Sequence, residues 1–154
     1  MPIARVREFL KPHGLEPIVF DERLNTSEEA ANKLGVELGQ IAKSILFRSN
    51  EDQFGLFVAA GDVRIHPKQV KALIGGKKQK MANPEEVTAV TGFQVGAVCP
   101  FALLQDIPVF IDESIQRFDV VYTAAGIAES LQPISFDQLV SITSGTLFKA
   151  SGEE

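Results

Sequence analysis

The sequence predicts an α+β fold, in which peripheral helices surround a mixed, mostly antiparallel sheet or a partly closed barrel. Two patterns lead to this class. Segments with the period-2 alternation of strands and segments with the 3.6-residue period of helices intermingle along the chain. They do not follow the strict strand–helix alternation of a doubly wound parallel sheet. The 154 residues contain no repeat, low-complexity linker or composition break, so we expect one domain over residues 1–154.

The N-terminal segments are expected to be a helix, a short strand and a second helix. Residues 2–13 carry apolar side chains at helical spacing, and residues 16–21 alternate as a strand does. Thr26 and Glu29 have the spacing of a capping box, in which the threonine hydroxyl accepts from a helical N–H and the carboxylate returns to the cap. This box predicts a helix over residues 27–34.

A strand hairpin and a basic helix are expected next. Residues 43–48 and 53–60 are apolar, strand-like runs joined by only four residues, which is typical of a hairpin. Residues 66–74 have a helical pattern with Pro67 in the first turn, where proline is tolerated, and two glycines follow. Residues 77–81 are expected to add a short strand.

The C-terminal half is expected to alternate between helices and short strands. Asn83 and Ser135 are the helix caps, because their side-chain oxygens accept from the first free N–H groups of a helix. The helix after Asn83 ends at Gly92. The remaining segments are expected to be strands over residues 107–112, 120–123 and 146–150 and a helix over residues 136–142.

The composition is that of an ordinary globular protein. Apolar residues make up 45% and charged residues 23%, and the longest apolar runs are far too short to span a membrane. The N-terminal residues lack the uninterrupted apolar core of a signal peptide, so we expect a cytoplasmic protein. The single cysteine, Cys99, and the isolated His13 and His66 do not have the spacing of a metal site. No metal or cofactor is therefore expected.

The net charge of −5 conceals a basic segment at residues 63–84. This segment has no Asp or Glu and six basic residues, which leaves a net charge of −11 for the rest of the chain. Such a basic segment is typical of proteins that bind phosphate groups, and it is equally typical of a solvated helix and loop without a partner. Both interpretations stay open. The basic residues are Arg64, Lys68, Lys71, Lys77, Lys78 and Lys80.

The stretch TGFQVGAVCPFA, residues 91–102, fits neither a helix nor a strand. Gly92, Gly96 and Pro100 interrupt its apolar residues. Glycine lets the main chain approach a ligand closely and turn its N–H groups toward it, while proline stiffens the end of the loop. The stretch is therefore a candidate binding loop for a small electrophilic or anionic group.

A few polar side chains are candidates for chemistry. Lys43 heads an apolar strand face, so its ammonium lies either at the mouth of a pocket or in water at the end of the strand. Cys99 offers a thiol, but a nucleophilic thiol needs a base and neither histidine is near it in the sequence. His66 is expected to be a cap or a surface residue. Asp62 and Arg64 flank a turn and are expected to pair with each other.

Five stretches, in order along the chain, resemble the YbaK and prolyl-tRNA editing family. They are TSEEAANKLGV, QIAKS, GDVRIHPKQVKAL, TGFQVGAVCPFA and YTAAG, and the resemblance covers nearly the whole chain. The most specific features are the lysine before a hydroxyl residue, Lys43-Ser44, and the GxxxP loop from Gly96 to Pro100. The resemblance implies a freestanding hydrolase that cleaves the ester between a wrongly attached small amino acid, such as alanine or cysteine, and a proline tRNA.

The resemblance also implies roles for individual residues. Lys43 orients the ester or the terminal ribose, and the N–H groups from Gly96 to Val98 polarise the ester carbonyl, so Lys43 and Gly96 are the catalytic residues. The basic segment receives the acceptor end of the tRNA, and prolyl-tRNA synthetase is a candidate partner. The substrate-binding residues are Phe20, Thr26, Ser44, Ala97, Val98, Pro100 and Gly126.

The amino acid that is removed and two other functions stay open. The chain departs from the cysteine-specific branch of the family at Phe20, Ala124 and the GAVCP loop, where that branch has tyrosine, serine and GGxSP. Alanine is therefore at least as well supported as cysteine, since one methylene is worth only about 1–3 kcal/mol of discrimination. The first alternative function is a non-catalytic module of the same fold that binds tRNA or a synthetase. The second is a small-molecule hydrolase that acts through Cys99.

Overall fold

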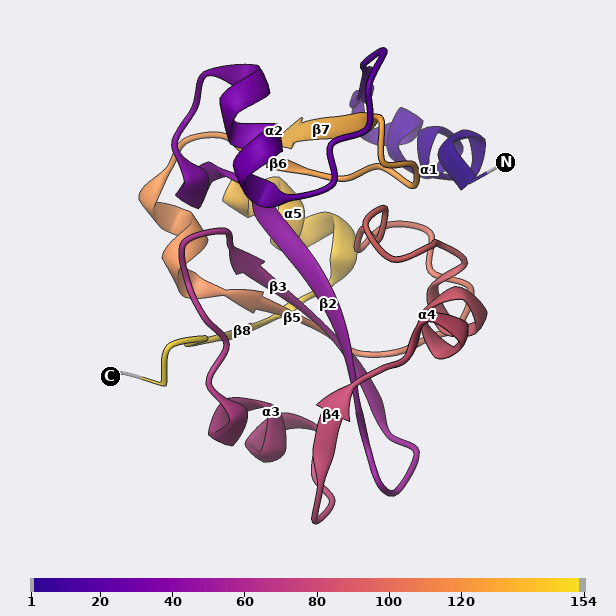
Figure 1. Cartoon of the computed structure of the whole chain (residues 1–154), viewed down its shortest axis with the longest axis vertical. Coiled ribbons are helices and arrows are strands. Elements are labelled where there is room, and N and C mark those ends of the chain that lie inside the picture. The colour runs from indigo at the N-terminus through magenta and orange to yellow at the C-terminus, as the bar shows by residue number, and fades with distance from the viewer. Residues whose placement is uncertain (1, 153–154) are drawn as a thin grey trace.

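The computed structural model describes residues 2–152, and it confirms the α+β class (Figure 1). Within these residues the chain forms five α-helices and eight strands in two sheets. The helices are α1 (Pro2–Leu10), α2 (Ser27–Leu34), α3 (Pro67–Ile74), α4 (Pro84–Thr91) and α5 (Phe136–Thr143). The strands are β1 (Ile18–Val19), β2 (Ala42–Ser49), β3 (Phe54–Ala60), β4 (Gln79–Met81), β5 (Val109–Asp112), β6 (Val121–Thr123), β7 (Ser130–Ile134) and β8 (Thr146–Phe148).

The larger sheet is mixed and has the strand order β4-β2-β3-β5-β8. Strand β2 pairs antiparallel with β3 and β4, whereas β3, β5 and β8 run parallel to one another. The smaller sheet, β1-β7-β6, is antiparallel. An isolated bridge between Ile41 and Tyr122 connects β2 to β6. Of the two predicted arrangements, the chain therefore adopts the mixed open sheet and not the partly closed barrel.

Helices cover both faces of the larger sheet. Helices α1, α4 and α5 pack on one face, in a core that includes Val6, Val87 and Leu139. Helix α3 packs on the other face, in a cluster that includes Phe57. Helix α2 covers the smaller sheet. Because β3 is buried on both faces, it is apolar along most of its length instead of alternating.

The helix caps predicted from the sequence are confirmed, except that within residues 2–152 the Glu29 carboxylate does not return to the Thr26 N–H as the predicted capping box requires. Thr26 Oγ1 accepts from the Glu29 N–H at 3.0 Å, and Asn83 and Ser135 each form a capping box. His66 caps α3, since its Nδ1 accepts a backbone N–H at 3.1 Å. Each of these interactions is made within one turn of chain, so the local sequence is sufficient to place it.

Some elements differ from the prediction. The sequence does not predict β7, because Pro133 lies within it and proline disfavours the interior of a sheet. Strand β1 pairs with only the first two residues of β7, so at Pro133 no strand on that side requires an N–H donor. The expected first helix ends early, and Pro12 lies in a 3₁₀ turn (Lys11–His13). Another 3₁₀ helix, η3 (Glu113–Arg117), follows β5 where none is expected.

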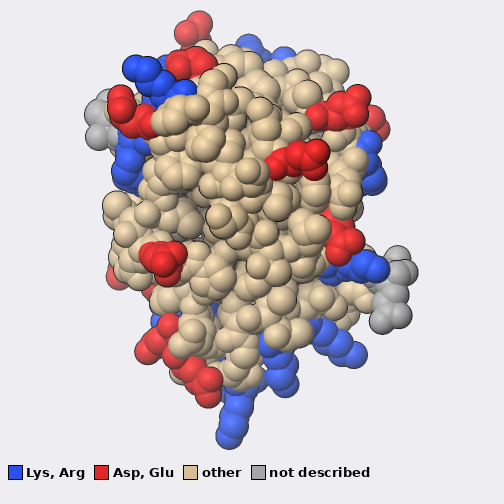
Figure 2. Space-filling view, turned by 180° about the vertical axis from the view of Figure 1, so that it is seen from behind, with Lys and Arg blue, Asp and Glu red and all other residues tan. Residues whose placement is uncertain are grey.

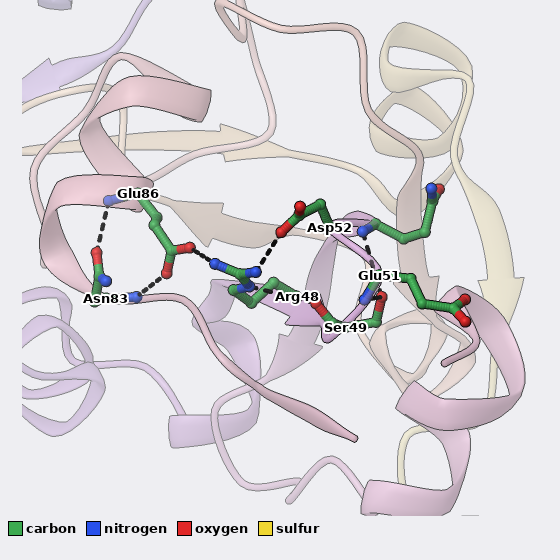
Figure 3. A network of polar contacts seen from close by, with 7 residues as sticks. Arg48, Ser49, Glu51, Asp52, Asn83 and Glu86 are labelled. Atoms are coloured by element: carbon green, nitrogen blue, oxygen red, sulfur yellow. Dashed lines mark hydrogen bonds and ion pairs between the residues drawn. The ribbon is translucent and has the colours of Figure 1, made fainter. Parts of the chain in front are cut away.

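Arg48 on β2 ties the β2–β3 hairpin to α4 (Figure 3). Its guanidinium pairs with Glu86 on α4 and with Asp52 in the hairpin turn. Glu86 also accepts from the Asn83 N–H at 2.9 Å, as part of the α4 capping box. This hydrogen bond from Asn83 and, after it, the Arg48 guanidinium hold the pKa of Glu86 below its usual range.

Glu86→Gln is expected to make the free energy of unfolding less dependent on pH in the acid range. A carboxylate whose pKa falls on folding stabilises the fold above its unfolded pKa, near about 4.3, and this stabilisation is lost as the pH falls through the lowered folded pKa. The free energy of unfolding should therefore decrease less steeply below about pH 4 in the variant than in the wild type. Urea unfolding measured across this pH range tests it, with the neighbouring exposed Glu85→Gln as the control. Equal slopes for both variants would contradict the assignment.

Candidate active site

A cavity of about 180 Å³ lies between α2, the start of β2, the loop after α4 and the β6–β7 turn. Five residues that the sequence predicts for the site line this cavity, namely Thr26, Lys43, Ser44, Gly96 and Val98. They come from three separate stretches, which the fold brings together. The other lining residues are Leu24, Asn25, Ser27, Ala30, Ile41, Ala42, Ala124, Ala128, Ser130 and Leu131.

Four residues predicted to bind the substrate lie outside this cavity. Ala97 and Gly126 line a neighbouring hollow. Pro100 is buried where the loop ends. Phe20 is half-buried in the cluster between α2 and the smaller sheet, and the Lys33 ammonium lies 6.0 Å from the centre of its ring. The cavity therefore includes only three of the seven residues predicted to bind the substrate, namely Thr26, Ser44 and Val98.

The apolar walls of the cavity come from residues that sequence reasoning missed. Leu24, Ile41 and Leu131 belong to the buried cluster between α2 and the smaller sheet. Leu131 and its neighbour Ser130 lie on β7, the strand that the sequence does not predict. The polar–apolar alternation of this strand was the available signal, and Pro133 obscures it.

The Ser44 hydroxyl is a buried polar group without a hydrogen-bond partner within residues 2–152. Alternation along β2 places it on the same face as Ala42 and Leu46, toward the larger core. An unpaired buried hydroxyl costs about 1–3 kcal/mol. A substrate that offers a polar atom here would remove that penalty, so Ser44 is a candidate substrate contact. The Ser130 hydroxyl, by contrast, already donates and accepts within the β6–β7 turn.

Lys43 supplies a positive charge at the cavity. The residue is half-buried at the start of β2, opposite Ala59 on β3. In the described part of the chain its ammonium has no carboxylate within ion-pair distance. The Arg117 guanidinium and, to a smaller extent, the Lys43 charge hold the pKa of Asp62 below its usual range. Lys43 is thus close to Asp62 without being paired to it, and its charge remains available to a substrate.

Asp62 pairs with Arg117 and not with Arg64, so the predicted Asp62–Arg64 pair is wrong. Arg117 donates two hydrogen bonds to the carboxylate, at 2.7 and 3.0 Å, from 55 residues away in the sequence. Arg117 ends η3, which follows β5, and β5 is the neighbour of β3 in the sheet. The sheet order therefore brings the two residues together, while Arg64 is exposed.

The loop after α4 presents two free backbone donors. A reverse turn runs from Gln94 to Ala97, whose N–H donates to the Gln94 carbonyl oxygen at 2.9 Å. Gly96 has a φ of +92°, which suits the third position of a type II turn. The N–H groups of Gly96 and Val98 make no hydrogen bond within residues 2–152. The Ala97 N–H is already used, so of the three predicted donors Gly96 and Val98 remain for the ester carbonyl.

The Cys99 thiol is unsuited to nucleophilic attack. The residue is fully buried, and burial raises the pKa of the thiol to about 12. The thiol also donates to the Phe101 carbonyl oxygen, at a distance of 3.8 Å. At neutral pH such a thiol is almost wholly protonated, and none of the described residues that line the cavity is a histidine. The structure thus argues against a hydrolase that acts through Cys99.

The part of the basic segment on β4 lies at the other end of β2 from the cavity, and none of the six basic residues of the segment lines the cavity. Its six basic residues are exposed before α3, on α3, in the loop after α3 and on β4. Lys and Arg side chains project from the lower end of the molecule (Figure 2), where Figure 1 places α3 and β4. Lys80 on β4 lies opposite Arg48, and about 17 Å of strand separates Arg48 from Lys43. The basic segment therefore does not border the cavity directly.

Together these features are compatible with a small acyl ester as the ligand. The lining of the cavity is both apolar and polar, and it includes the Lys43 cation, the unpaired Ser44 hydroxyl and two residues, Gly96 and Val98, whose N–H groups are unpaired within the described residues. An ester carbonyl oxygen needs such donors when it becomes negative during hydrolysis. Within residues 2–152 no cluster of His, Cys, Asp or Glu is placed to hold a metal ion. No helix in the same range is long and apolar enough to cross a membrane.

Known proteins are similar to this chain in sequence and in fold. Residues 12–142 match the family described as the aminoacyl-tRNA editing domain, and the chain belongs to this family. The chain is 44% identical over 107 residues to the uncharacterised protein YwhH of Bacillus subtilis, a match that covers 70% of this chain and 68% of YwhH. It is 23% identical over 149 residues to EbsC of Enterococcus faecalis, a candidate Cys-tRNA(Pro)/Cys-tRNA(Cys) deacylase, covering 97% of this chain and 91% of EbsC.

A solved structure supports the same assignment. The structure of a candidate trans-editing enzyme for prolyl tRNA synthetase matches with a TM-score of 0.88 at 29% identity, and the match covers 96% of this chain and 95% of that chain. The predictions of the family and of an aminoacyl-tRNA deacylase are therefore confirmed at the level of the family.

Proposed function

We propose that this protein is a freestanding editing hydrolase that removes a small amino acid, such as alanine or cysteine, from a mischarged proline tRNA. The observation that carries the proposal is the cavity of about 180 Å³, which places Lys43 and Gly96 at the same small space. Its apolar walls, including Leu24 and Leu131, and its volume suit a small side chain. The proposal places the protein in the cytoplasm, with the tRNA acceptor end as its partner.

The proposed reaction is hydrolysis of the aminoacyl ester. A water oxygen attacks the carbonyl carbon, and the carbonyl oxygen becomes an oxyanion that accepts from the N–H groups of Gly96 and Val98. The C–O bond to the terminal ribose then breaks, and its electron pair goes to the ribose oxygen. The proton that the water loses passes to this oxygen by way of the neighbouring ribose hydroxyl, since none of the described residues that line the cavity is His, Asp or Glu. Lys43 stabilises the negative charge as it develops.

Ser44 bears on which amino acid is removed. A buried hydroxyl without a partner favours a substrate with a polar atom at that position. An alanine side chain has no such atom, so with alanine the partner of Ser44 would be the α-amino group or the ester itself. A thiol or hydroxyl side chain would reach Ser44 directly. Serine therefore belongs among the candidate substrates beside alanine and cysteine.

Proline tRNA charged in turn with alanine, cysteine, serine and proline tests the proposed function. We expect release of at least one of the three wrong amino acids at about ten times the rate in buffer or faster, and no release of proline. A parallel filter-binding measurement with uncharged tRNA covers the non-catalytic alternative. Binding of the tRNA with no release from any charged form would favour a binding module over the enzyme. Addition of prolyl-tRNA synthetase to the same reactions tests whether it is a partner.

A further inference from the structure

Arg5 on α1 binds the main chain on both sides of the Gly96 turn. Its Nε donates to the Ala102 carbonyl oxygen at 2.9 Å, and its Nη2 donates to the Thr91 carbonyl oxygen at 3.0 Å. Thr91 ends α4, before the turn, and Ala102 follows the turn. One guanidinium from the N-terminal helix therefore connects the two segments between which the turn is held.

Both carbonyl oxygens depend on a donor from outside the loop. The carbonyl groups in the last turn of a helix have no partner within that helix, and Thr91 is the last residue of α4. Ala102 has a φ of +54°, a conformation that a residue with a side chain keeps only where its surroundings hold it. Within residues 2–152 no backbone N–H donates to either oxygen. Arg5 supplies charged donors to both, and hydrogen bonds from a charged group are roughly twice as strong as neutral ones.

The Phe93 ring connects Arg5 to another wall of the cavity. The Arg5 guanidinium lies over this ring, 4.6 Å from its centre, and Phe93 is only 1% exposed. On the β6–β7 turn, a Cβ built on Gly126 would lie 3.2 Å from Phe93 Cε1, so the turn packs directly against the ring. The same turn carries Ala124 and Ala128, which line the cavity. Arg5 is therefore linked through Phe93 to the β6–β7 turn as well as to the loop.

Gly92 leaves room for the Arg5 side chain. A Cβ on Gly92 would collide with the Arg5 guanidinium and would lie 2.8 Å from Leu104 Cγ. Gly92 also has a φ of +83°, as the left-handed residue that ends α4. Any larger residue here would displace Arg5 from the Thr91 carbonyl oxygen. The glycine predicted to end the helix therefore has a second role, since it lets Arg5 reach the loop.

We propose that Arg5 is a positioning residue for the hydrolysis, because it fixes the direction of the Gly96 and Val98 N–H groups toward the ester carbonyl oxygen. This inference rests on the proposed function. Arg5 does not line the cavity, so it acts through the loop and not on the substrate. The two N–H groups make no hydrogen bond of their own within residues 2–152, so their direction depends on how the loop is held. A misplacement of about 1 Å can lower the rate of an enzyme about a hundredfold.

Arg5→Met tests this role in the hydrolysis assay. The variant keeps an apolar side chain beside Phe93 and removes both hydrogen bonds. We expect kcat for the charged tRNA to fall about tenfold or more and KM to change by less than about twofold, since the oxyanion forms only in the transition state. Arg7→Met is the matched control, because Arg7 lies on the same helix, is exposed and pairs with Glu16 at 3.3 Å. It should keep kcat within about twofold of the wild type.

Thermal unfolding of the three proteins gives an assay temperature at which all of them are folded. At that temperature a loss of overall stability does not lower kcat, so a lower kcat of Arg5→Met reports on the loop. A kcat of Arg5→Met within about twofold of the wild type would overturn the proposal. A raised KM with unchanged kcat would overturn it too, because Arg5 would then bind the tRNA itself.

Arg5→Lys separates the two hydrogen bonds from the positive charge. The variant keeps a cation near the Phe93 ring, but a single ammonium does not reproduce the planar fork that reaches both carbonyl oxygens. We expect its kcat to be at least about threefold lower than that of the wild type. The full kcat in Arg5→Lys would show that the charge is sufficient and would contradict the role given to the two hydrogen bonds.

¹⁵N NMR relaxation of the protein without tRNA separates this inference from the proposed function. In Arg5→Met we expect the amide shifts of Gly96 and Val98 to change and their order parameters to fall, whereas β2 and β3 stay as in the wild type. Arg7→Met should leave both amides unchanged. Unchanged shifts and order parameters in Arg5→Met would overturn the proposal even if the wild type hydrolyses the charged tRNA. If the wild type hydrolyses no charged tRNA, the proposed function fails, and the NMR comparison still shows whether Arg5 holds the loop.

Discussion

Lys43→Ala is expected to lower kcat/KM for the charged tRNA by about tenfold or more, which corresponds to at least about 1.4 kcal/mol of transition-state stabilisation. The reason is the state of the lysine charge in the free protein. Lys43 lines the cavity, is half-buried and has no ion-pair partner within the described residues. Its charge can therefore act on the negative charge that develops at the ester, in surroundings that screen it less than water does.

The fold should survive this substitution, because Lys43 makes no contact that holds two elements together in the described structure. Thermal unfolding of the variant and the wild type checks this point. Lys33→Ala is the matched control: Lys33 lies on the nearby helix α2, is exposed and pairs with Glu22 at 2.7 Å, and it does not line the cavity. If the Lys43→Ala protein hydrolysed the charged tRNA at the full rate, Lys43 would not take part in catalysis. An equal loss of kcat/KM in both variants would indicate a general effect of charge.

The parts of the fold that could be predicted are those encoded by neighbouring residues. The Thr26 cap and the capping boxes at Asn83 and Ser135 fix the starts of three helices, because both partners of each hydrogen bond lie within one turn. The β2–β3 hairpin follows from two apolar runs and a short connection. These signals depend on a few residues in sequence, so no knowledge of the tertiary structure is needed.

The parts that could not be predicted depend on contacts between distant segments. Asp62 pairs with Arg117 because β3 and β5 are neighbours in the sheet, and no local sequence pattern predicts this pair. Strand β7 forms around Pro133 because the short β1 leaves that edge unpaired. Since β7 supplies Ser130 and Leu131 to the cavity, the same missed strand accounts for the missed wall of the site.

The loop at residues 91–102 also has features that could be predicted from the sequence and features that could not. Its glycines and proline correctly mark residues 92–102 as irregular, whereas Thr91 still belongs to α4, and they do not show which N–H groups are free. The reverse turn uses the Ala97 N–H and leaves those of Gly96 and Val98. It also directs Ala97 to a different hollow from its two neighbours. The backbone conformation of Gly96 therefore decides both which donors are free and which residues of the loop line the cavity.

Gly96→Ala is expected to lower kcat/KM by about tenfold or more and the free energy of unfolding by about 1–2 kcal/mol. A methyl group at Gly96 meets no atom within 4 Å, so the effect does not come from a clash. It comes from the φ of +92°, which an L-residue adopts only with strain. Relief of this strain requires the turn to change, and a changed turn redirects the free N–H groups of Gly96 and Val98 away from the ester.

Gly14→Ala separates the loss of stability from the loss of activity. Gly14 has a φ of +72°, and a methyl group there would also meet no atom within 4 Å, but Gly14 follows the 3₁₀ turn after α1 and does not line the cavity. Its backbone penalty should be similar, about 1–2 kcal/mol, with kcat/KM unchanged. Urea unfolding and single-turnover hydrolysis of both variants give the two quantities. If both variants lose stability equally and both keep the wild-type rate, the backbone donors at Gly96 do not act on the ester.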